Sequence, residues 1–544
     1  MITAIVLQLQ FLMTTLFCAA LSMGIGGCAL LVDQDAFRSL SLGILGAVGI
    51  LGVGTLSLLF NFFVPLNDYY FVFLCLVSVL GWVQLRKKTP DIFVKKDIVV
   101  LLISIAVFWL LGLRRVMNSD TGLYHIPIIH WMEISALPIG LGNVHTRFGV
   151  WNFLFSVCGG VNAGNILPLS VYCMNIVLVG FASVDFCRWI YNKKDLAHYF
   201  AVAVFAYFSL LDLWYFSGGQ KSPNADFAGM IFAIWVIPYF LERKEALTEW
   251  VRPAIILGGL AILTKLNGAP LVLVMLLAID RSRRQIGKPL PLFMLGLVVS
   301  AGLLSLLKSF LVSGCLVFPA QATCAPVSWG IRKEDVLGTY SWVIRWARWP
   351  DGPADLVLHT WNWVPHWWSA NSPNQIFFCT QWISILFVFL KLVFKTRVPK
   401  LDLAALLIAL VGMAYWFFSA PDIRFGYGYF VTVFGILAGT LLRWVFENPK
   451  LLFLEKWFVR VMVAIVVVSA FAQVRRAPDL GMNTLIEPSP KYKVMKNVLN
   501  QSVYVPDENE CWRLPVPCEP YYVSEVVETQ FGIWSKYEDR RRSP

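Results

Sequence analysis

The residues best suited to chemistry lie in polar segments between long apolar runs. The first segment, 118–125, reads NSDTGLYH and follows closely on an apolar run at 98–113. Its carboxylate, Asp120, is therefore expected at the membrane surface, where the chain leaves the bilayer. Asp120 can accept a proton in a reaction, or it can cap a helix or pair with Arg114 or Arg115. The sequence leaves these alternatives open.

The next residues, 124–135, combine helical periodicity with polar side chains. Apolar residues recur at near-helical spacing, and Tyr124, His125, His130 and Glu133 supply the polar points. This pattern predicts a helix in the plane of the membrane interface. Its apolar side would face lipid or pack against other helices.

Two turns add further charged side chains. The glycine-rich turn GLGNVHTR presents His145 and Arg147, and the turn APDIRFGY, between two apolar runs, carries Asp422 and Arg424. Asp422 and Arg424 can pair with each other. Alternatively, Arg424 can bind a phosphate group, for which the guanidinium geometry is well suited.

A lysine and an asparagine interrupt another apolar stretch. Lys265 and Asn267 lie in the segment LTKLNGAP, and a cation there should face protein or a cavity because it is expensive in lipid. The surrounding stretch, 251–279, is either two short spans or two half-helices that meet at a break. A break is tolerated only inside protein or beside water.

The loop 313–374 is long and rich in aromatic residues. It opens with SGCLVFP, and Trp and Arg recur between 342 and 368. Loops longer than about 12–15 residues are usually functional or disordered, and this composition is too aromatic for disorder. An aromatic belt at the membrane interface explains most of the Trp residues. The alternative is that Arg and Trp bind an anionic amphiphile such as a sugar phosphate.

The composition is that of an integral membrane protein. Hydrophobic residues make up 58% of the 544 residues and charged residues 14%, whereas a soluble domain carries about 25% charged residues. The net charge of +12 comes from Lys and Arg in short clusters between apolar runs. That distribution sets membrane orientation and does not build a basic groove, so nucleic acid is not expected as a partner.

The hydropathy predicts an all-α, polytopic bundle of about 12–14 transmembrane spans, with long non-cytoplasmic loops that carry short interfacial helices. The expected spans are 3–31, 40–65, 67–85, 98–113, 164–187, 197–216, 225–241, 251–264, 269–279, 289–312, 375–396, 401–420, 427–446 and 457–474. They divide the chain into a three-helix extension at 1–97, a core at 98–474 and a small tail at 475–544. The core carries the outer loops 114–163 and 313–374.

The basic residues and the cysteines agree on orientation. The Lys and Arg clusters of the connections fall on one side, taken as cytoplasmic, which leaves both termini non-cytoplasmic. Cys315 and Cys324 share one outer loop, and Cys511 and Cys518 share the tail. Both pairs therefore lie where disulfides form, although unpaired thiols remain the alternative.

The early acidic residue followed by a horizontal helix resembles the C-type (GT-C) multi-pass glycosyltransferases. The stretches PDIRFG at 421–426 and SGCLVFP at 313–319 are similar to late-loop elements of bacterial members. The motifs LYH and GLGNVHTR resemble a group of uncharacterised bacterial multi-pass membrane proteins. The likeness extends from about residue 100 over most of the chain. Three additional spans precede the acidic residue, and Asp120 stands alone where many members carry two adjacent acids.

The resemblance implies an inverting sugar transfer from a polyprenyl-phosphate donor at the non-cytoplasmic face of a bacterial inner membrane. Asp120 would be the base, and the acceptor would be a glycan, a lipid or a protein. The expected substrate-binding residues are Tyr124, His125, His130, Glu133, His145, Arg147, Lys265, Asn267, Asp422 and Arg424. A divalent metal is left open as a cofactor, because the histidine spacings match no standard metal signature. The competing functions are a transporter or flippase of a lipid-linked glycan and a surface-polysaccharide polymerase or ligase.

Overall fold

The computed structural model of the chain is mostly helical in the part that it describes. That part comprises residues 2–32, 40–89, 92–111, 119–164, 166–167, 169–192, 195–210, 220–242, 248–283, 292–370, 400–446, 452–476, 487–529 and 532–536. The expected span at 375–396 lies outside the described residues, as do Arg114 and Arg115.

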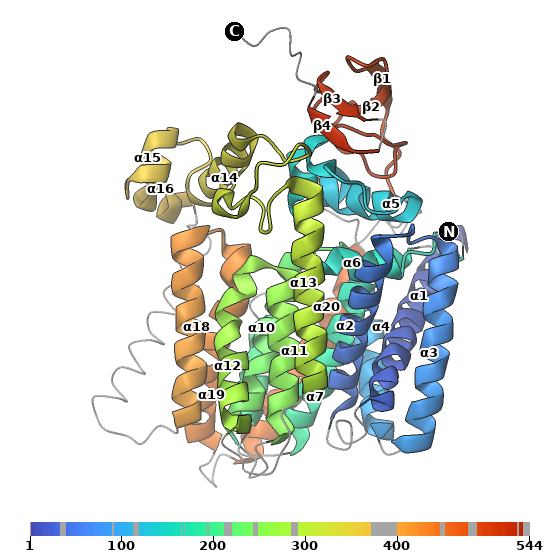
Figure 1. Cartoon of the computed structure of the whole chain (residues 1–544). Helices are drawn as coiled ribbons and strands as arrows, with labels where there is room; N and C mark the ends of the chain where they lie inside the picture. The colour runs from blue at the N-terminus through green and yellow to red at the C-terminus, as the bar shows by residue number, and fades with distance from the viewer. Residues whose placement is uncertain are drawn as a thin grey trace.

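A bundle of long helices forms the body of the molecule (Figure 1). In chain order they are α1 (Ile2–Gly27), α2 (Leu42–Asn61), α3 (Asp68–Lys88), α4 (Lys95–Leu111), α7 (Met174–Asn192), α8 (Leu196–Leu210), α10 (Ala225–Leu241), α11 (Thr248–Thr264), α12 (Val272–Arg283), α13 (Leu292–Ser313), α18 (Lys400–Ser419), α19 (Ile423–Phe446) and α20 (Leu452–Arg476). Among the described residues, six helices are long and apolar enough to cross a membrane: Val6–Leu31, Leu42–Asn61, Asp68–Lys88, Met174–Tyr191, Leu292–Ser313 and Ile423–Phe446. The helical bundle and its fit to a lipid bilayer agree with the prediction.

Side-chain caps fix the start of α3 and of α10, the helix that carries the site residue Asp226. Asn67 accepts a hydrogen bond from the N–H of Tyr69 at 3.1 Å and so begins α3. Asn224 accepts one from the N–H of Asp226 at 2.9 Å and begins α10. Such caps satisfy N–H groups that have no partner inside the helix. Asp226 is therefore placed in the first turn of α10, where the helix dipole favours a carboxylate.

The interrupted stretch at 251–279 forms two helices that lie side by side (Figure 1). α11 ends at Thr264, and a short 3-10 helix, η8 (Leu266–Leu271), leads into α12. Gly268 makes the turn possible because a Cβ at this position would lie 2.2 Å from the carbonyl oxygen of Ala261. Lys265 and Asn267 consequently stand at one end of the bundle.

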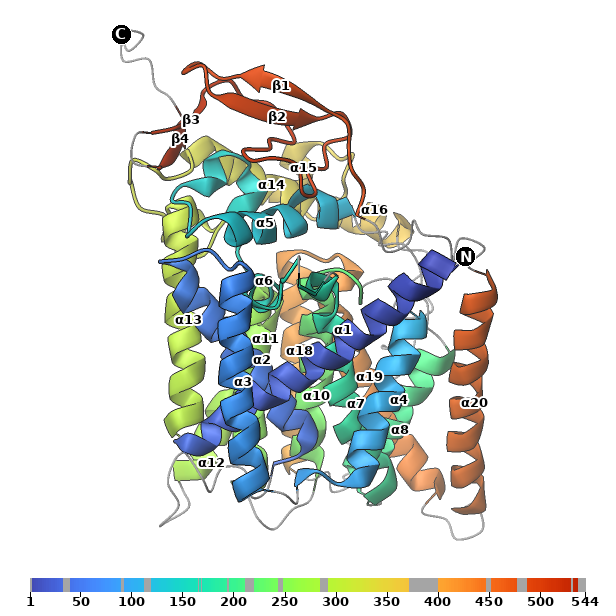
Figure 2. The same cartoon turned by 90° about the vertical axis from the view of Figure 1, so that its right-hand side faces the viewer.

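One end of the bundle is covered by the outer segments and is called the capped end below (Figures 1 and 2). The elements there are a π-helix, η4 (Thr121–His125), then α5 (Ile126–Ile134), α6 (Phe153–Gly160), α14 (Lys333–Arg348), α15 (Ala354–His359) and α16 (Trp363–Ala370). α5 was expected in the interface plane, and its apolar side packs against protein. Trp131 and Met132 are buried, and the carbonyl of Met132 accepts the N–H of Leu66 at 2.7 Å.

The loop that carries α14–α16 contains both buried and exposed tryptophans. Trp363 and Trp367 are buried, and the indole N–H of Trp367 donates to the carbonyl of Pro421 at 2.7 Å. Trp346 and Trp361 are exposed. The loop therefore supports the turn before α19 and also presents aromatic rings at the surface.

The described part of the tail contains four short strands, which the sequence analysis did not predict. β1 (Tyr492–Lys496) pairs antiparallel with β2 (Ser502–Pro506), and β3 (Val526–Glu528) pairs antiparallel with β4 (Trp534–Lys536). Disulfides join Cys315 to Cys324 in the outer loop and Cys511 to Cys518 in the tail. The tail bridge pins a segment against β2, where the N–H of Tyr504 donates to Pro517 at 2.9 Å.

Candidate functional site

A cluster of charged side chains joins segments far apart in the sequence at the capped end. Asp120 lies just before η4, and its Oδ1 is 3.1 Å from Nη1 of Arg147 in the following turn. Its Oδ2 is 3.5 Å from Nη1 of Arg424 in the first turn of α19. Asp120, Arg147 and Arg424, which the sequence predicted as site residues, are thus brought together.

Arg424 is the residue that links the carboxylates of this cluster. Its Nε lies 3.4 Å from Asp422 Oδ2 and 3.9 Å from Asp226 Oδ2. The carboxylate of Asp422 also accepts the backbone N–H of Arg424 at 3.0 Å, which fixes the start of α19. The guanidinium lies 4.8 Å from the ring centre of Phe425, in cation–π range.

Asp226 is a site residue that the sequence analysis missed. Nζ of Lys265 donates a hydrogen bond to Asp226 Oδ1 and lies 3.8 Å from the ring centre of Phe425. The sequence signal that could have identified Asp226 is Asn224, a helix-capping residue at the end of the expected outer segment 217–224. That placement puts Asp226 at the same end of the bundle as Asp120.

A small crevice opens beside these charges. It lies between α10, η8 and α19, and its volume of about 20 Å³ gives room for about one water molecule. The lining residues are Ala225, Asp226, Gly229, Met230, Ala233, Lys265, Asn267, Gly268, Arg424, Phe425, Gly428 and Tyr429. A Cβ at Gly229 would meet nothing within 4 Å, so the crevice is open along this part of α10. Asn267 donates to the carbonyl of Phe425 at 2.9 Å and ties η8 to α19.

Tyr124 and His125 support the segment that carries Asp120. The guanidinium of Arg147 lies 5.5 Å from the Tyr124 ring, and the Nδ1 of His125 lies 3.2 Å from the hydroxyl of Ser222. Burial lowers the pKa of His125 to about 3, aided by the neighbouring cations Lys265, Arg147 and Arg424 and opposed by Asp120. His125 is consequently neutral near pH 7 and suits a positioning role.

His130 and Glu133 belong to a separate cluster that anchors the tail. Nδ1 of His130 lies 3.3 Å from Glu133 Oε2, and Arg513 donates to the same oxygen at 2.5 Å. Arg513 also pairs with Glu487 at 3.0 Å. Burial opposes ionisation of Glu133, but His130, Arg513 and Asn162 outweigh it and lower the pKa of Glu133 to about 2.

The histidines predicted from the sequence do not converge. The ring of His145 stacks on Tyr521 with centroids 5.7 Å apart, and burial lowers its pKa to about 3. His125 faces Ser222, and His130 faces Glu133. Among the described residues, no group of three or more His, Cys, Asp or Glu side chains is placed to hold a metal ion.

The fold and the site together define a helical protein with apolar helices suited to a bilayer and a charged, half-buried site at one end. The chain belongs to the family described as a domain of unknown function (DUF8201), whose model matches residues 6–431. That range includes the whole Asp120 cluster and ends before the tail. Neither the curated proteins nor the solved structures give a match.

Proposed function

We propose that this protein is a membrane glycosyltransferase that takes a sugar from a polyprenyl-phosphate carrier at the capped end, on the non-cytoplasmic face. The observation that carries the proposal is the sharing of Arg424 between Asp120 and Asp226 beside a small crevice. Sugar transfer from a lipid phosphate needs a base and a cationic clamp for the leaving group. This cluster contains both kinds of group at contact distance.

The cations of the cluster suit the departing phosphate. Arg424 and Arg147 offer guanidinium groups that bind phosphate oxygens in pairs, and Lys265 adds a point charge at the crevice. A phosphate that binds these cations competes with the carboxylates for them. The clamp therefore stabilises negative charge as the bond to the sugar breaks.

The same competition prepares the base. When phosphate draws Arg147 and Arg424 away, the carboxylate of Asp120 loses its ion pairs with them and accepts a proton more readily. Asp120 then takes the proton of the acceptor hydroxyl, and the acceptor oxygen bonds to the anomeric carbon. The bond from that carbon to the phosphate oxygen breaks with its electron pair, and the anomeric configuration inverts.

The test compares the native chain with Asp120→Asn in detergent, against a panel of polyprenyl-phosphate sugars. Free polyprenyl phosphate is measured as product. We expect at least about a hundredfold slower release in the variant, which is the usual size of general-base catalysis. Asp351→Asn, at an exposed position of the same end, is the matched control and should keep full activity. Full activity in Asp120→Asn would remove Asp120 from the mechanism.

A transporter of a lipid-linked glycan is the second candidate. The break between α11 and α12 favours it, because interrupted helices beside a charged site are typical of transporters. The two functions differ in product. A transporter moves the intact donor across the vesicle membrane and releases no polyprenyl phosphate, whereas a transferase releases it.

A further inference from the structure

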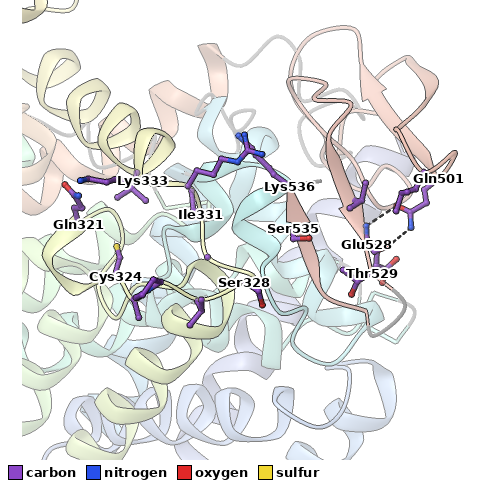
Figure 3. A pocket seen from close by; sticks show the side chains of 18 residues that line it. Gln321, Cys324, Ser328, Ile331, Lys333, Gln501, Glu528, Thr529, Ser535 and Lys536 are labelled. Atoms are coloured by element: carbon purple, nitrogen blue, oxygen red, sulfur yellow. Dashed lines mark hydrogen bonds between the residues drawn. The ribbon is translucent and has the colours of Figure 1, made fainter. Parts of the chain in front are cut away.

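A wide groove separates the outer loop from the tail at the capped end (Figure 3). It has a volume of about 1070 Å³ and lies apart from the Asp120 crevice, with which it shares no lining residue. Residues 321–336 form one wall, and residues 499–501, 527–529 and 535–536 form the other. Pockets for small ligands have volumes of about 300–1,000 Å³, so this groove lies at the upper end of that range and has room for a short oligosaccharide.

Specific bonds hold the two walls together. The side-chain amide of Asn143 donates to the carbonyls of Trp329 at 2.8 Å and Trp534 at 3.2 Å, one on each wall. Nζ of Lys536 lies 2.5 Å from Asp335 Oδ2 and joins the walls a second time. The groove is therefore a built feature of the fold and keeps a defined width.

The lining offers many hydrogen-bonding groups that the protein itself leaves unused. The side chains of Gln321, Ser328 and Ser535 line the groove and make no hydrogen bond with other described residues. Short apolar side chains such as Val327 and Val527 also line the groove. A lining that combines hydroxyl, amide and apolar groups suits the hydroxyl groups and carbon faces of a saccharide chain.

The charges of the lining favour an anion. Arg332 and Lys333 are exposed on the groove, and Glu528 is the carboxylate among the described lining residues. Both cations stand at the N-terminal end of α14, where the helix dipole disfavours positive side chains. Their placement is thus not explained by the stability of α14.

The groove adjoins the turn that positions Arg147. Ile331 lines the groove and is buried against Gly142, where a Cβ would lie 2.6 Å from its Cδ1, and against Gly149. Arg147 lies in that turn and contacts Asp120. A chain bound in the groove would therefore lie against the segment that holds the proposed catalytic carboxylate.

We propose that this groove binds an acidic oligosaccharide, whose carboxylate groups pair with Arg332 and Lys333. Its role as the acceptor rests on the proposed transferase function, whereas binding itself does not. The probe is a labelled hyaluronan octasaccharide, with neutral maltooctaose for comparison, titrated into the full-length protein in detergent.

The key variant is Arg332→Gln/Lys333→Gln, and the matched control is Lys491→Gln/Lys493→Gln. The control removes the same charge from exposed positions of the tail that do not line the groove. We expect hyaluronan to bind about tenfold more weakly to the groove variant and with unchanged affinity to the control. Thermal unfolding verifies that both variants fold.

Equal hyaluronan affinity in the groove variant and the native chain would overturn the proposal, as would equally tight binding of maltooctaose. Asp120→Asn separates the two proposals. If Asp120→Asn still binds hyaluronan, and this binding still depends on Arg332 and Lys333, the result supports the acidic-glycan groove. It does so whether or not the native chain releases polyprenyl phosphate. Release by the native chain without hyaluronan binding would support the transferase and refute the acidic-glycan groove.

Discussion

Arg424 shows how one side chain organises the candidate site. It contacts Asp120, which precedes η4, Asp226 in the first turn of α10, and Asp422, which precedes α19. Three distant parts of the chain therefore meet at one guanidinium. Half-buried opposite charges hold this geometry because each group would lose favourable interactions if its partner left. Arg424 is consequently both a structural link and the best-placed group to bind phosphate.

Gly229 allows the crevice to be tested without altering any charge. A Cβ at this position meets nothing within 4 Å, so Gly229→Ala should fold normally and gain about 0.5–1 kcal/mol of stability from better helix propensity. Gly229→Leu should fill the crevice and lower polyprenyl-phosphate release at least about tenfold, since the added side chain would keep the donor phosphate from the charged groups beside it. Release and thermal unfolding are measured on both variants. Native activity in a folded Gly229→Leu would place donor binding elsewhere.

At the scale of elements, the apolar runs predicted most of the bundle helices because burial in lipid or protein needs long apolar segments. The tail strands were not predictable in the same way. Each is three to five residues long, and pairing depends on a disulfide and on contacts with distant segments. Propensity is a weak guide for such short strands, since their stability comes from packing.

The candidate site was predictable only in part. Asp120, Lys265, Asp422 and Arg424 stood out because charged residues at the ends of apolar runs are expected at a membrane surface and not in lipid. Asp226 was missed because it follows a helix cap and looks like an ordinary first-turn acid. His130, Glu133 and His145 were grouped with Asp120 by sequence proximity, but the structure places them against the tail.

The fold of the tail should depend on pH through Glu519. Burial raises the pKa of Glu519 to about 7, although the backbone N–H of Val523 opposes the shift, and among the described residues Oε1 has no hydrogen-bond partner. Because the folded-state pKa exceeds the unfolded value, this group's contribution to stability is fully present below the unfolded pKa. It is lost as pH rises through about 7.

We therefore expect the tail to lose about 3 kcal/mol of local stability between about pH 5 and pH 8. Hydrogen–deuterium exchange of the β2 amides, corrected for the intrinsic rate, measures this change. Glu519→Gln keeps an acceptor for Val523 and should make the protection independent of pH. The same pH dependence in the variant would assign the effect to another group.

The whole molecule is polarised along the axis of the bundle. The Asp120 cluster, the groove and both disulfides lie in the segments of the capped end. α1 also begins at this end (Figure 2). α3 begins beside α5 at the capped end, so its basic last turn, with Arg86, lies at the opposite end. This separation of disulfides from basic residues is the basis of the proposed orientation.

Cysteine labelling in intact cells tests that orientation. Lys493→Cys lies in the tail at the capped end, and Lys87→Cys lies at the opposite end of α3. If the positive-inside rule sets the topology, a membrane-impermeant maleimide should label Lys493→Cys in intact cells and Lys87→Cys only after permeabilisation. The native chain is the background control, because it shows how much its own half-buried cysteines, Cys28, Cys75 and Cys187, are labelled. The reverse pattern would put the capped end in the cytoplasm, where disulfides are rare, and would contradict a donor site on the outer face.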